Sequence, residues 1–146
     1  MRLFEILRDK PFRLIALPPT ATALEAASVM KAEHVGAVLV LDDVNRLLGL
    51  VSERELVLGM AADGVALLRR RVSEVMSVGG PTARPNDSVT HVMRTMTERR
   101  ARHVPVLDGD AVVGVVSIGD VLKARLAEKV EENAVLQELA RLRFAA

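Results

Sequence analysis

The sequence predicts an α/β (α+β) protein in which two pseudo-symmetric β-α-β-β-α repeats pack through their sheets and a C-terminal helix follows. The main observation is an internal repeat. The segment from Pro19 to Ser52 reappears from Pro85 to Ser117, at a spacing of 66 residues that slips to 65 after the turn at Asp108. Two copies are too few for a solenoid and instead predict paired half-domains, with two matching clefts where they meet.

The composition predicts one compact domain with an aliphatic core. Half of the 146 residues are hydrophobic and 27% are charged, a balance typical of globular proteins. Only three residues are aromatic, which argues against binding of single-stranded nucleic acid by base stacking. The net charge of +1 provides no bulk field for DNA or an anionic membrane, and the lack of cysteine excludes disulfides and thiolate chemistry.

Targeting and metal signals are weak in this sequence. The N-terminal segment carries charges where a signal peptide would need an apolar run. No apolar stretch approaches the roughly 18 residues of a membrane span, and three scattered histidines offer no metal site of imidazole type. We therefore expect a cytoplasmic protein with no membrane contact and no resident metal.

Hydrophobic periodicity predicts the elements of the first repeat. Residues 4–8 have the pattern of a short amphipathic helix, and residues 14–17 predict a short strand that Pro18 stops. Thr22, with Glu25 three residues later, predicts a helix start by its capping-box spacing. The remaining elements are a buried strand over 35–41, a turn over 42–45, a partner strand over 47–51 and a helix from Ser52 to Met60.

The second repeat shows the same order. Thr82 and Ala83 predict the short strand, and Ser88 caps a helix that runs to Arg99. The next elements are a strand over 104–107, a turn over 108–110, a strand over 112–116, and a helix that begins at Ser117. The expected organisation is an N-terminal helix over 1–10, repeat 1 over 11–62, a linker helix over 63–76, repeat 2 over 77–125 and a C-terminal helix over 126–146.

The C-terminal helix has two interpretations. Its apolar residues, Leu126, Val130, Leu136, Leu139 and Leu142, form an imperfect stripe. The helix either packs back on its own domain or pairs two chains, and the sequence favours neither.

The strongest local signal is a serine where a strand runs into a helix, followed three residues later by an acid. The pairs are Ser52 with Glu55 and Ser117 with Asp120. The simpler interpretation is a helix capping box, in which hydroxyl and carboxylate satisfy free backbone amides. The alternative is a nucleotide site, because a helix N-terminus attracts phosphate and a carboxylate can accept both hydroxyls of a ribose. Taken alone, the motif favours the capping box.

Basic residues precede the first hairpin strand of the second repeat. A solvated helix end explains Arg99 and Arg100, because cations there interact favourably with the helix dipole. It explains Arg102 and His103 less well, since they lie at the mouth of a strand, where ligands commonly bind. The matching residues 35–37 of the first repeat are small and uncharged, so we expect the two clefts to differ chemically.

Other candidate residues carry weaker signals. His34 and His91 lack partners of metal-ligand type, and the run 69–71 of three arginines is better explained as the polar face of a linker helix than as a nucleic-acid patch. No nucleophile, base and acid set stands out, and neither does a glycine-rich phosphate loop. We therefore expect that the protein is not an enzyme.

Four segments carry a family resemblance. They are VGAVLVLD (35–42), GLVSERE (49–55), RHVPVLD (102–108) and GVVSIGD (114–120). Over roughly residues 3–125 the sequence resembles a tandem pair of CBS domains (cystathionine-β-synthase-type repeats, together a Bateman module). The tail with Glu132, Asn133 and Leu136 is similar to that of small stand-alone CBS-pair regulatory proteins.

The resemblance implies two clefts that bind an adenosyl ligand, AMP first, with ADP, ATP, NAD and S-adenosylmethionine as alternatives. In the family, the acid of the serine motif holds the ribose and the other repeat encloses adenine. One site would consist of Ser117, Asp120, Ile15, Ala16, Val35, Gly36 and Ala37. The other would consist of Ser52, Arg54, Glu55, Pro81, Thr82, Arg102, His103 and Val104. Because Glu55 replaces the usual aspartate, we expect tighter adenosine binding beside Asp120 and a larger gain from added phosphates beside Glu55.

The resemblance further implies a non-catalytic module that senses adenine nucleotides, forms a flat homodimer, and signals to an unidentified protein through its conformation or assembly. The alternative is a protein-interaction or scaffolding module with vestigial clefts. Nucleic-acid binding through residues 69–71 is a third possibility that we do not expect. Thermal stabilisation by nucleotide separates the first two, because a ligand that binds only the folded state raises its midpoint.

Overall fold

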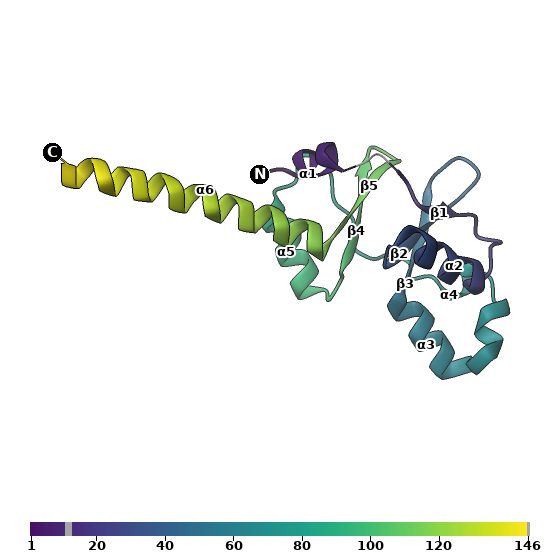
Figure 1. The fold of residues 1–146 in the computed structure, drawn as a ribbon. Coiled ribbons are helices and arrows are strands. Elements are labelled where there is room, and N and C mark those ends of the chain that lie inside the picture. Colours follow the sequence, from purple (N-terminus) through teal and green to yellow (C-terminus); the bar gives the residue numbers. More distant parts are fainter. Residues whose placement is uncertain (11–12, 146) are drawn as a thin grey trace.

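The structure is a computed structural model that describes residues 1–10 and 13–145. Figure 1 shows two α/β lobes and a long C-terminal helix. The elements of the first half are α1 (Leu3–Asp9), β1 (Ala16–Leu17), α2 (Ala23–Glu33), β2 (Ala37–Leu41), β3 (Leu47–Ser52), α3 (Glu53–Asp63), the 3-10 helix η1 (Gly64–Arg69) and α4 (Val72–Val75). Those of the second half are α5 (Val89–Glu98), β4 (His103–Asp108), β5 (Ala111–Ser117) and α6 (Ile118–Ala145).

The predicted α/β class with two repeats and a C-terminal helix is confirmed, and the sheets repeat each other in detail. In the first lobe, β1 runs parallel to β2 and β2 pairs antiparallel with β3. In the second lobe, β4 pairs antiparallel with β5. Both hairpins shift register at the same repeat position, between Val40 and Leu41 and between Val106 and Leu107.

Several elements are shorter than the sequence predicts, among them the strand expected over 14–17, which is Ala16–Leu17. The strand expected over 35–41 begins at Ala37, because the Val35 N–H still bonds to the Met30 carbonyl at the end of α2. The short strand expected at Thr82 and Ala83 is a single parallel bridge from Ala83 to Val106. It extends no further because the next N–H, that of Arg84, donates to Asp87 Oδ2 at 2.8 Å.

The hydrophobic core has three parts. One cluster lies in each lobe, and a third, built around Leu39, Leu41 and Val112, contains residues from both sheets. This third cluster is the expected contact between sheets. It consists of aliphatic side chains alone, since the chain has few aromatic residues.

The core of each lobe is completed by the helix that precedes the other lobe in the sequence. Leu3 and Ile6 of α1 belong to the core of the second lobe, whereas Val72 of α4 belongs to the core of the first. The contacts are close. A Cβ on Gly49 would lie 2.6 Å from Met76 Sδ, and a Cβ on Gly114 would lie 2.6 Å from Leu7 Cδ2. Glycine at these two matching strand positions therefore lets each helix segment reach the sheet.

The C-terminal helix does not pack back on its own lobe along its whole length. Figure 1 shows α6 projecting away from the two lobes. Val121 and Ala124 are buried in the first turns, but every residue from 129 to 144 is exposed. Within the described residues, the interpretation of α6 as a helix packed on its own domain therefore holds only for its first turns.

The packing of α1 in the core of the second lobe can be tested by measuring stability, with a control residue on the same helix. Leu3 is fully buried, so Leu3→Ala should lower the free energy of unfolding by about 2–5 kcal/mol through lost burial and the cavity it leaves. Phe4, which is 44% exposed on the same helix, serves as the control, and Phe4→Ala should change stability little. Urea denaturation measures both. Equal effects would contradict the placement of α1 in the second core.

Candidate functional site

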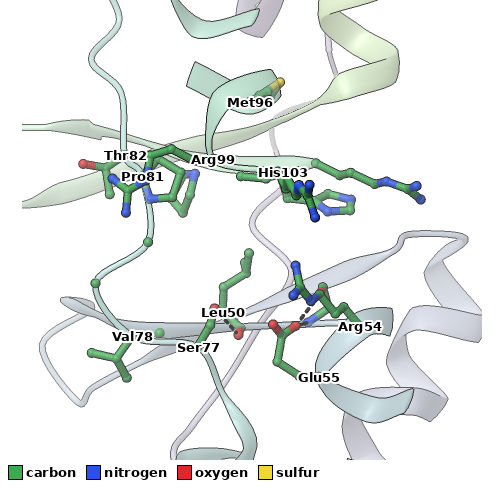
Figure 2. A pocket seen from close by; sticks show the side chains of 18 of the residues that line it. Leu50, Arg54, Glu55, Ser77, Val78, Pro81, Thr82, Met96, Arg99 and His103 are labelled. Carbon is green, nitrogen blue, oxygen red and sulfur yellow. Dashed lines mark hydrogen bonds between the residues drawn. The ribbon is translucent and has the colours of Figure 1, made fainter. Parts of the chain in front are cut away.

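A cleft of about 1170 Å³ lies between the two lobes. One wall is the junction of β3 and α3, from Ser52 to Glu55. The opposite wall consists of the turn between α5 and β4, with Pro81 and Thr82 beside it. Figure 2 shows Arg54 and Glu55 on one side facing Arg99 and His103 on the other. The volume is on the scale of a pocket for a small-molecule ligand.

The cleft has an excess of positive charge. Its charged lining residues are four arginines and two glutamates, namely Arg54, Arg99, Arg100, Arg102, Glu53 and Glu55. All four arginines are exposed, so their guanidinium groups are accessible to a ligand in the cleft. Because a guanidinium presents a planar set of donors, this lining suits phosphate or carboxylate groups.

Glu55 caps its own helix. Its Oε2 atom accepts the Ser52 backbone N–H at 2.7 Å and also the Ser52 hydroxyl. These bonds satisfy a free amide at the start of α3, as the capping-box interpretation requires. A ribose diol would therefore compete with the Ser52 hydroxyl for this oxygen.

His103 lies at the seam between the lobes, against Gly36. A Cβ on Gly36 would be 3.2 Å from His103 Cε1 and 3.4 Å from Glu53 Oε1, a tight contact that would require the imidazole to shift slightly. Burial lowers the pKa of His103, and Arg102 and Lys10 act in the same direction, against the opposing effect of Glu53 and Asp120. The lowered pKa favours the neutral imidazole, so His103 offers the cleft a hydrogen-bonding group more than a cationic charge.

The second serine motif has a different partner. Ser117 and Asp120 form a reciprocal capping box, with the Ser117 N–H on Oδ2 at 2.8 Å and the Asp120 N–H on Ser117 Oγ at 3.2 Å. Lys10 Nζ also lies 2.7 Å from Oδ2 and donates to the Val115 carbonyl at 3.0 Å. Burial of Asp120 raises its pKa, but the bonds from Lys10 and Ser117 outweigh this effect, and the net pKa is lowered. Asp120 is thus an ion-paired carboxylate.

The structure brings most residues of the expected Glu55 site together. Those that line the cleft are Ser52, Arg54, Glu55, Pro81, Thr82, Arg102 and His103. Val104 is an exception, since it is only 1% exposed and belongs to the core of the second lobe. It follows His103 in β4, and successive side chains of a strand point to opposite faces.

The residues of the expected Asp120 site are distributed differently. Ile15 and Val35 pack against the core of the first lobe, Ala16 packs at the contact between sheets, and Ala37 pairs with Ser52. Gly36 lines the arginine-rich cleft, on the same side as Glu55. Ser117 and Asp120 are absent from the lining of that cleft and lie beside Lys10.

Three charged residues of these sites do not follow from the sequence pattern. The sequence favours a solvated helix end for Arg99 and Arg100, yet both line the cleft. Their place in the repeat could have revealed them, because they precede Arg102 in the turn that forms the cleft wall. Lys10 had no comparable signal, since its contact with Asp120 joins residues 110 positions apart in the chain.

Two further features bear on function. No helix among the described residues is long and apolar enough to cross a bilayer. In the same part of the chain, no three or more histidine, cysteine, aspartate or glutamate side chains are arranged to hold a metal ion.

Comparison with known proteins identifies relatives. The CBS domain model matches residues 5–61 and 72–127. A mitochondrial CBS domain-containing protein of Arabidopsis thaliana, CBSX3, is 32% identical over 124 residues, which cover 80% of this chain and only 60% of that protein.

Solved structures agree. A CBS-domain containing protein from Agrobacterium tumefaciens has a TM-score of 0.82 at 35% identity, covering 86% of this chain and 99% of its own. A CBS domain protein from Pyrobaculum aerophilum, solved in complex with AMP, has a TM-score of 0.72 at 27% identity, covering 82% and 89%. With two matches that together span most of its length, this chain belongs to the CBS domain family.

Proposed function

We propose that this chain is a non-catalytic regulatory module that binds adenine nucleotides in the cleft between its two lobes and signals through a change of conformation or assembly. The observation that carries the proposal is the cleft itself, in which arginines of the second lobe face the start of α3 in the first. A ligand held there contacts both lobes, so its binding energy depends on their relative arrangement.

The cleft lining offers a place for each part of a nucleotide. Leu50, Val78 and Pro81 supply apolar surface for a base. Figure 2 shows Leu50 and Val78 on the side of Glu55 and Pro81 on the side of Arg99 and His103, so a base would lie between them. Phosphate oxygens would lie toward the turn at Arg99–Arg102, away from the carboxylates Glu53 and Glu55. The AMP complex of the Pyrobaculum aerophilum relative supports an adenosine ligand.

Arginine 102 provides the direct test of this arrangement. Arg102→Ala should weaken binding of ADP and ATP by about 10-fold, since a hydrogen bond to a charged group contributes about 1.5–3 kcal/mol and an exposed guanidinium the lower part of that range. Adenosine binding should change little. Calorimetric titration measures both.

Arg94 is the matched control for this substitution. It is exposed on α5 and is not among the residues that line the cleft, so Arg94→Ala should leave all affinities unchanged. Equal losses for Arg94→Ala and Arg102→Ala would point to bulk charge instead of a site. A wild-type chain that binds none of these ligands would favour the scaffolding function.

We also propose a second adenosine site beside Asp120, with Lys10 as its competitor. Because Lys10 and the Ser117 amide both bond to Oδ2, a ribose must use Oδ1 or displace the lysine. Asp120→Ala should then weaken the tighter of two AMP-binding events by about 10- to 150-fold. Lys10→Met removes the competitor, together with its bond to the Val115 carbonyl, and should preserve or strengthen that event. If Asp120→Ala folds and binds AMP like wild type, Asp120 is a helix cap alone.

The proposed module is a homodimer. Apolar side chains remain uncovered on two helices: Met60 on α3 is 51% exposed, and Leu122 and Leu126 on α6 are 49% and 66% exposed. Association of two chains would cover such surfaces. Light scattering at micromolar concentration should report about twice the chain mass of 15.8 kDa. A mass of one chain would contradict the proposed dimer.

A further inference from the structure

The helices α2 and α5 end in the same backbone motif. In each, one residue after the helix adopts a left-handed conformation, His34 with φ of 54° and Arg100 with φ of 52°. The N–H of the next residue then bonds back to a carbonyl five residues earlier, from Val35 to Met30 at 3.1 Å and from Ala101 to Met96 at 3.0 Å. This is the Schellman type of helix end, which usually has glycine at the left-handed position.

An arginine at this position is strained. A Cβ in the left-handed region crowds the following carbonyl oxygen, whereas glycine adopts the region freely. Backbone strain of this kind clusters at functional sites. Arg100 therefore keeps a side chain at a position where glycine would be free of strain.

The surroundings of Arg100 point to an anionic ligand. Its side chain is exposed and lines the cleft, together with those of Arg99 and Arg102. Among the described residues, the Arg100 guanidinium takes part in no ion pair or side-chain hydrogen bond, unlike the arginines at 13, 46, 70 and 125, which pair with carboxylates. Its donors are thus free, and two neighbouring arginines add charge of the same sign.

The equivalent residue of the first repeat differs in this respect. His34 has the same backbone conformation but is not among the residues that line the cleft. The strain is therefore common to both repeats, whereas the position beside the cleft belongs to Arg100. This pair separates the effect of backbone conformation from the effect of the side chain.

We propose that Arg100 is a phosphate-binding residue that makes the cleft prefer a polyphosphate chain, such as that of a nucleoside di- or triphosphate, over a single phosphate. The inference rests on the proposed function, because it assigns a ligand class to the same cleft. Three arginines within four residues can divide their donors among several phosphate groups, and one phosphate group cannot engage all of them. The left-handed backbone sets the direction in which the Arg100 side chain leaves the turn.

The test compares Arg100→Gly with His34→Gly. Both should raise the melting temperature by about 2–4 °C, because each relieves one left-handed non-glycine residue. Arg100→Gly alone should weaken binding of ATP and of inorganic tripolyphosphate by about 10-fold, with a change in AMP affinity below about threefold. Titration calorimetry and thermal unfolding of the full chain measure these quantities.

The outcomes distinguish this inference from the function on which it rests. Unchanged ATP and tripolyphosphate affinity in Arg100→Gly would overturn the role of Arg100, while AMP binding by wild type would still support the nucleotide module. Binding of tripolyphosphate but of no adenosine compound, with loss in Arg100→Gly, would support Arg100 and overturn the adenine proposal. A wild-type chain that binds none of these ligands would overturn both.

Discussion

The structure depends on one packing constraint, the exchange of covering helices between the two lobes. The segment of α4 closes the sheet of the first lobe through Met76, and α1 closes that of the second through Leu7. Both contacts are made against a glycine of the facing strand, Gly49 and Gly114, and at Gly49 the Ser77 carbonyl oxygen, 2.7 Å from the place of a Cβ, also excludes a larger residue. Because each core contains side chains from both family matches, neither match holds a complete core of its own. The exchange thereby fixes the two lobes against each other and defines the cleft between them.

The two serine motifs show how the same local chemistry acquires different surroundings. Each forms a capping box, through Glu55 in one lobe and Asp120 in the other. The Glu55 box faces a wall of arginines across the cleft, whereas the Asp120 box pairs with Lys10 at the end of α1. The difference follows from the helix exchange, because the exchange brings the start of the chain to the second lobe. Pseudo-symmetry of the fold therefore does not extend to its charges.

His103 lies at the contact between the two lobes, near both serine motifs. Its imidazole lies against Gly36 and close to Glu53 of the first lobe, and its pKa responds to Lys10 and Asp120 as well as to burial. A ligand that places negative charge beside His103 would favour its protonated form. Protonation of His103 would change the electrostatic potential at charged groups of both motifs, since these groups lie near the imidazole.

The sequence by itself determined the repeat, the order of the elements and the family, and most of the residues it named for the Glu55 site do line the arginine-rich cleft. These follow from local periodicity, capping spacing and motifs, which act over a few residues. Only the tertiary structure decided that Val104 is buried, that Gly36 belongs to the cleft with Glu55, and that Lys10 holds Asp120. It also decided that α6 leaves its own lobe after the first turns. The physical reason is that these contacts join segments far apart in the chain, and local pattern contains no information on which distant side chain will fill a given space.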